Sequence, residues 1–185
     1  MPLSAPVARD PIHTRRVICH GFRRKDGLWD IEGHLTDTKD YDFQRLFRPD
    51  LLKTGEPLHK MSVRITIDDD LLIHAVEAVT DESPFPHCGD IAPKFSTLKG
   101  LNLAQGFLKE VRTRFGGVNG CTHIVEMMGP IATTAFQTIF PVLSREREQS
   151  GRPPVIDSCH AFSADGPVVA RLWPQYATSD NAHEK

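Results

Sequence analysis

Three residues that can bind metal ions stand where elements of secondary structure are expected to begin. His59 precedes an alternating strand pattern, and Cys88 and Cys121 precede two segments with helical spacing. The N-terminus of a helix stabilises a negative thiolate, and thiolates bind soft metals. With His123 as the fourth candidate, this set of side chains is suited to zinc or iron. The alternative is that both cysteines are small buried residues at helix starts, since free cysteine is often buried.

A second group of polar residues belongs to the first predicted hairpin. Alternation along the second strand places Glu32 and His34 on one face, and we expect Arg15 of the partner strand to lie across from them. In this arrangement Arg15 holds a substrate carboxylate, while Glu32 or His34 moves a proton. The alternative is a solvated surface, which is the common role of mixed charges on a strand.

Two hairpins and three helices must position these residues. The first hairpin pairs residues 14–22 with 28–36, and the second pairs 61–67 with 72–79. Apolar residues at helical spacing predict helices over 90–98, 102–115 and 122–143. We therefore predict an α+β fold in which the helices cover one face of an antiparallel sheet. A last small hairpin is expected around Ala164-Asp165-Gly166.

Length and charge restrict the organisation and the partners of the chain. The 185 residues suit one domain, predicted over 13–176, with an N-terminal arm over 1–12 and a C-terminal tail over 177–185. A net charge of -2 argues against nucleic acid and membranes as partners. No apolar run suits a membrane span or a leader, so we expect a cytoplasmic protein, with a homo-oligomer left open. In that compartment the four cysteines are expected to be thiols or ligands.

Several specific strings give the chain a resemblance to a known family. They are HTRR, DGLWDIEGHLTDTK, GEPLHKM and GGVNGCTH. The chain resembles an uncharacterised bacterial family defined by a domain of unknown function, over most of residues 12–175. This resemblance implies a small catabolic enzyme, a lyase whose partner is an aromatic substrate of the lignin-derived phenylpropanoid type.

Residues 55–140 also resemble the U-type iron-sulfur cluster scaffolds. The corresponding segments are Gly55-Glu56-Pro57-Leu58-His59, the hairpin 61–79, Cys88-Gly89 and Cys121-Thr122. His59 stands where the scaffolds have their first cysteine, and the aspartate that follows it there is missing. The resemblance implies a scaffold-like fold in which His59, Cys88 and Cys121 converge.

These observations support two hypotheses from different classes. The first is an enzyme with a mononuclear zinc or iron ion that catalyses a retro-aldol or similar carbon–carbon cleavage of a carboxylated aromatic compound. The second is a non-catalytic protein that handles a metal or an iron-sulfur cluster. A stoichiometric colourless metal favours the first hypothesis, and a labile brown cluster favours the second.

Overall fold

The first hairpin consists of strands β1 (His13–Arg23) and β2 (Trp29–Lys39). Its turn is closed by the N–H of Arg24, which donates to the carbonyl oxygen of Leu28 at 2.8 Å, and Gly27 supplies the positive φ of 87° that this turn requires. Alternate residues of β2, beginning at Trp29, are buried. The predicted hairpin is confirmed, because both of its signals, alternation and a glycine turn, are local.

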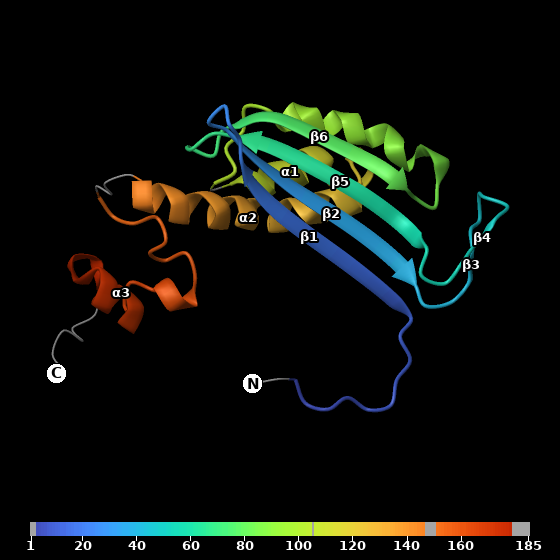
Figure 1. Ribbon diagram of the computed structural model, residues 1–185, viewed down its shortest axis with the longest axis horizontal. Helices are drawn as coiled ribbons and strands as arrows, with labels where there is room; N and C mark the ends of the chain where they lie inside the picture. The colour runs from blue at the N-terminus through green and yellow to red at the C-terminus, as the bar shows by residue number, and fades with distance from the viewer. Residues whose placement is uncertain (1–2, 105, 147–150, 179–185) are drawn as a thin grey trace. The chain divides into compact units, whose positions relative to one another are not determined.

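The second hairpin completes an antiparallel sheet in the computed structural model of the chain (Figure 1). Strands β5 (Pro57–Ile67) and β6 (Ile73–Glu82) pair with each other, and the strand order is β1-β2-β5-β6. The connection between the hairpins contains two very short paired strands, β3 (Phe43–Gln44) and β4 (Leu51–Leu52). The α+β class predicted from the sequence is confirmed.

Three helical segments follow the sheet in the chain. They are the 3-10 helix η1 (Pro86–Leu98) and the α-helices α1 (Phe107–Phe115) and α2 (Thr122–Glu146). The helix predicted over 102–115 begins later than expected because Gly106 adopts a left-handed conformation, while Asn102 forms a bridge with Leu72. The short 3-10 turn η2 (Gly117–Asn119) leads into α2.

Helix α2 lies very close to the first hairpin because two strand positions there are glycine. A Cβ atom at Gly21 would lie 1.9 Å from the Oγ1 of Thr138, and one at Gly33 would lie 2.7 Å from the Cδ1 of Ile131. The buried residues of α2 pack in this hydrophobic layer; they are Ile124, Met127, Met128, Ile131, Ala135 and Ile139. The absence of side chains on the strands therefore sets how near the helix can approach.

The structure describes residues 3–104, 106–146 and 151–178, and it divides into two compact units, Met1–Val142 and Leu143–Lys185. The sequence predicts one domain over 13–176. The second unit contains α3 (Pro167–Leu172) and the 3-10 turns η3 (His160–Phe162) and η4 (Pro174–Tyr176). The hairpin predicted around residues 164–166 is wrong, because Pro167 fits the first position of a helix and α3 begins there.

No helix among the described residues is both long enough and apolar enough to cross a membrane.

Candidate metal and acid-base site

A row of three polar residues crosses the end of the sheet on the face that carries α2. Asp37 of β2 is in register with Arg15 of β1 on one side and with His59 of β5 on the other. Residues opposite each other in an antiparallel pair project from the same face, so the three side chains meet. The register of β2 with β5 shifts between Asp37 and Thr38, and such a bulge re-aims side chains beside functional sites.

The fourth member of the site comes from the N-terminus of α2. The Nε2 of His123 lies 3.5 Å from the Oδ2 of Asp37. The imidazole rings of His123 and His59 are in contact, with centroids 3.9 Å apart and planes inclined by 34°. Helix and sheet therefore bring two histidines against one carboxylate.

Asp37 is the centre of this site and is 1% exposed. The guanidinium of Arg15 donates two hydrogen bonds to it, from Nε to Oδ1 and from Nη2 to Oδ2, each 2.8 Å long. His13 approaches from the solvent side, with its Nε2 3.4 Å from Oδ1. Burial acts to raise the pKa of Asp37, but the hydrogen bonds and charge of Arg15 outweigh it and hold that pKa below its usual value. A buried carboxylate is thus kept negative by a bidentate arginine.

Arg15 also contacts α2. Its Nη1 donates to the Oε2 of Glu126 at 2.6 Å, so all three of its nitrogens bond to carboxylates. The hydrogen bond to Asp37 is the main cause that raises the pKa of Arg15. Because both of its partners belong to the protein, the geometry favours Arg15 as a group that orients Asp37.

Lowered pKa values keep both half-buried histidines neutral at pH 7. Burial and the neighbouring charge of His123 lower the pKa of His59 to about 4, although Asp37 acts in the opposite direction. Burial and then the charge of Arg15 lower the pKa of His123. A carboxylate can only accept hydrogen bonds, so neutral His59 donates its Nδ1–H to the Oδ2 of Asp37 over 3.1 Å when no ion is bound. The other neutral tautomer, with the proton on Nε2, frees the lone pair of Nδ1 for an ion beside Oδ2.

The group formed by Asp37, His59 and His123 can hold a metal ion. Each residue offers one ligand atom, and these atoms lie within 4.8 Å of one another. The separations of 3.1 and 3.5 Å from Oδ2 of Asp37 to the histidine nitrogens agree with the roughly 3–3.5 Å between neighbouring ligands about 2.0–2.2 Å from one ion. Two neutral imidazoles and a carboxylate suit zinc or ferrous iron.

The structure brings together part of the predicted metal set. His59 and His123 meet, and Cys121 lies beside them with its Sγ 3.9 Å from the Nδ1 of His123. Cys88 lies at the start of η1, where the neighbouring Gly89 faces Thr80 of β6. Among the residues that the structure describes, neither cysteine belongs to a group of three ligand atoms with this spacing. A set of four ligands that includes both cysteines stays a prediction.

Asp37 was not among the predicted ligands, although the sequence contains a signal for it. In β2 the buried positions are Trp29, Ile31, Gly33, Leu35 and Asp37. The alternation therefore places an acid on the hydrophobic face, and a buried acid requires a partner. The same alternation, continued to residue 37, places Asp37 on the buried face of β2 and Glu32 and His34 on the opposite face.

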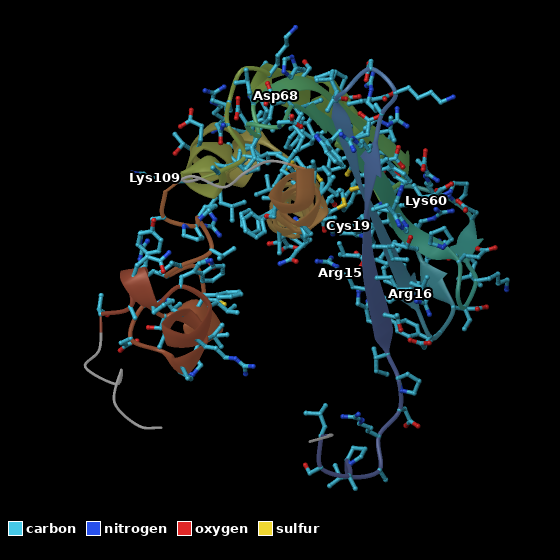
Figure 2. All side chains as sticks on the ribbon, turned by 60° about the vertical axis from the view of Figure 1, so that its left-hand side comes forward. Arg15, Arg16, Cys19, Lys60, Asp68 and Lys109 are labelled. Carbon is cyan, nitrogen blue, oxygen red and sulfur yellow. The ribbon has the colours of Figure 1, made fainter. Side chains whose placement is uncertain are left out.

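The expectation that Arg15 lies across from Glu32 and His34 is wrong. Arg15 pairs with Asp37, which has the opposite parity in β2, so Arg15 projects toward α2 and the other two residues project from the opposite face. Figure 2 shows the same division, with Arg15 and Cys19 on the helix side of the sheet and Lys60 on the other side. A catalytic role for Glu32 and His34 stays a prediction, on a face separate from the Asp37 site.

On that opposite face the polar residues contact one another in an exposed network. The Nδ1 of His34 lies 2.9 Å from the Oγ of Ser62, and its Nε2 lies 3.6 Å from the Oε2 of Glu32. Arg64 donates from Nε to Glu32 at 2.8 Å and from Nη1 to Glu77 at 3.1 Å. The side chain of His34 is 44% exposed, so water screens these charges.

A family model matches most of the chain. Residues 13–137 match a family model described as a protein of unknown function (DUF2889). This span includes Arg15, Asp37, His59 and His123. No curated protein and no solved structure matches the chain. The resemblance to iron-sulfur cluster scaffolds therefore stays a prediction.

Proposed function

The chain belongs to the DUF2889 family of proteins of unknown function, and we propose that it is a small metal-dependent enzyme, a carbon–carbon lyase. The observation that carries this proposal is the group formed by the buried Asp37 and the half-buried His59 and His123. Structural metal sites are commonly closed by four protein ligands, whereas catalytic sites keep an open position. Three protein ligands at one end of a sheet leave such a position for a substrate oxygen.

The protonation states of the group support metal binding at neutral pH. Metal ligands must carry a lone pair, and the lowered pKa values of His59 and His123 keep both imidazoles unprotonated. The bound ion would act as a Lewis acid on a substrate oxygen. Arg15 would hold Asp37 in one orientation through its two hydrogen bonds.

The reaction we propose is a retro-aldol cleavage. A substrate hydroxyl loses its proton, its carbon becomes an aldehyde carbon, and the adjacent carbon–carbon bond breaks. The electron pair of that bond passes to the departing carbon, which is neutralised by a proton. His13 is the group proposed to carry the proton, because it contacts Asp37 and its side chain is 35% exposed to solvent. Glu32 and His34, for which the sequence predicts this role, lie on the opposite face of the sheet, so their role stays a separate prediction.

The proposed substrate is a carboxylated aromatic compound of the lignin-derived phenylpropanoid type. This part rests on the resemblance to a catabolic family. Arg15 is already bonded to two carboxylates of the protein, so its predicted role as the holder of the substrate carboxylate is not part of the proposal.

Metal analysis of matched variants tests the proposal. We expect wild-type protein to bind one equivalent of zinc or ferrous iron, and we expect His59→Gln and His123→Gln to weaken this binding at least tenfold. His34→Gln is the control, because it removes an imidazole from the opposite face of the sheet. Equal metal binding by wild type and all three variants would refute the metal site.

A formaldehyde assay tests the proposed lyase activity. Metal-loaded protein is incubated with aromatic carboxylates that carry a hydroxymethyl side chain, and the released formaldehyde is measured. Release that depends on metal and is lost in His59→Gln supports the lyase. Metal binding without turnover across such a panel would favour the alternative, a protein that handles metal without catalysis.

A further inference from the structure

The two ring nitrogens of His123 face different groups. Nε2 faces Asp37, as described above, and Nδ1 faces the sulfur of Cys121 at 3.9 Å. The same sulfur lies 3.9 Å from the Sδ of Met61, a β5 residue that is 1% exposed. A thiol, a thioether and an imidazole nitrogen therefore lie together on the side of His123 away from Asp37.

Both separations from the sulfur of Cys121 suit ligands of one ion. Ligands in a trigonal plane, with metal–sulfur distances of about 2.3 Å and metal–nitrogen distances of about 2.0 Å, are separated by roughly 3.7–4.0 Å. The two observed separations from the sulfur of Cys121 are both 3.9 Å. The sulfur atoms need little movement to share an ion.

The types of ligand select the ion. Thiolate and thioether sulfur are soft ligands that favour Cu(I), whereas carboxylate and imidazole suit harder divalent ions. The two sides of His123 therefore differ in the class of ion they prefer.

We propose that Cys121, Met61 and the Nδ1 of His123 form a binding site for Cu(I), separate from the divalent site at Asp37. On binding, the thiol of Cys121 releases its proton to solvent and its sulfur forms a bond to the ion. The ion stays Cu(I), so no oxidant or reductant is consumed.

The two sites compete because neutral His123 carries a single ring proton. An ion on Nδ1 requires that proton on Nε2, where it faces the Oδ2 of Asp37. His123 is then unable to bind a divalent ion through Nε2. Each ion therefore weakens binding of the other by the same factor, as thermodynamic linkage requires.

Anaerobic titration of Cu(I) against a chromophoric Cu(I) chelator tests the site. We expect Cys121→Ser to weaken binding at least a hundredfold and Met61→Leu to weaken it about tenfold. Met61→Leu keeps the size of a buried apolar side chain, and circular dichroism checks that this variant folds. The control is Cys159→Ser, which removes an exposed thiol of the second unit.

Two results of this titration would overturn the proposal. One is wild-type Cu(I) affinity in folded Met61→Leu, and the other is a loss in Cys159→Ser equal to that in Cys121→Ser. X-ray absorption of the Cu(I) form provides a second measurement, with two sulfur neighbours and one nitrogen neighbour expected and a single sulfur neighbour contradicting the site.

The competition is tested separately by repeating the Cu(I) titration with saturating zinc. We expect at least a tenfold weaker Cu(I) affinity in wild type and a smaller effect in His59→Gln, which lacks a ligand only of the divalent site. Unchanged affinity in the presence of bound zinc would refute competition through His123. Because Cu(I) is titrated alone in the first experiment, the sulfur site and the proposed lyase can fail independently.

Discussion

The two faces of the four-stranded sheet carry the same kinds of polar side chain in different surroundings. On the face that α2 covers, Arg15, Asp37 and His59 form a row in which the carboxylate is 1% exposed. On the other face, Glu32 bonds to Arg64 beside a His34 that is 44% exposed. An acid, an arginine and a histidine occur in both sets. Burial rather than composition makes the first set suited to bind a metal ion.

The largest expected difference between the faces is in the cost of neutralising the acid. Asp37→Asn removes a carboxylate that is 1% exposed and accepts two hydrogen bonds from Arg15, and we expect a loss of about 2 kcal/mol in the free energy of unfolding. Glu32→Gln removes a screened partner of Arg64 and should cost less than about 1 kcal/mol. Urea unfolding at pH 7 measures both. Equal losses would mean that burial does not distinguish the two faces.

The pH dependence of stability provides a second comparison. The pKa of His59 falls from 6.5 to about 4 on folding, so the unfolded chain binds more protons between these values. The folded chain therefore becomes less stable as the pH falls from 6.5 toward 4, because burial disfavours the proton that the unfolded chain takes up. After allowing for partial solvent screening we expect a loss of about 2 kcal/mol. The lowered pKa of Asp37 acts in the same direction at still lower pH.

Urea unfolding from pH 7 to pH 4 measures this slope. His59→Gln should flatten the slope between pH 6.5 and 4, and His34→Gln controls for the loss of an imidazole at an exposed position. A slope that is unchanged in His59→Gln would show that other groups cause the acid sensitivity.

The smallest effect is expected for the exposed network itself. Arg64 forms two ion pairs, with Glu32 and Glu77, but its side chain is 49% exposed. Arg64→Ala should lower the free energy of unfolding by about 0.5 kcal/mol, and added salt should reduce this difference. A loss close to that of Asp37→Asn would contradict the interpretation of this face as solvated.

Much of the sheet could be predicted from the sequence because its signals are local. The alternation in β5 and the turns at Gly27 and Asp68-Asp69-Asp70 define both hairpins without reference to the rest of the chain. The start of α1 could not be predicted as well. Leu103 continues the four-residue apolar spacing of the helix, but its N–H donates to the carbonyl oxygen of Leu71 and the neighbouring Asn102 pairs with Leu72.

Part of the candidate site could also be predicted from local signals. His59 and His123 stand out by residue type, and the parity of Asp37 could be read from β2. The contact between His123 and Asp37 depends on where α2 lies on the sheet, and no local pattern encodes that position. Arg15 and His34 lie on opposite faces of the sheet because successive residues of a strand project from alternate faces. An error of one residue in the predicted register therefore moves a side chain to the other face.

Gly21 and Gly33, the two glycines beneath α2, affect the position of residues at the far end of that helix. Glu126 of α2 contacts Arg15, and Thr138 approaches Gly21, so two contacts with β1 lie about 18 Å apart along the helix axis at a rise of about 1.5 Å per residue. His123 lies at the N-terminal end of α2, whereas the contact of Thr138 with Gly21 sets the distance between α2 and β1 farther along the helix. A methyl group at Gly21 or Gly33 would lift the helix and lengthen the 3.5 Å gap between His123 and Asp37. The geometry of the proposed metal site thus depends partly on two residues that have no side chain and lie outside the site.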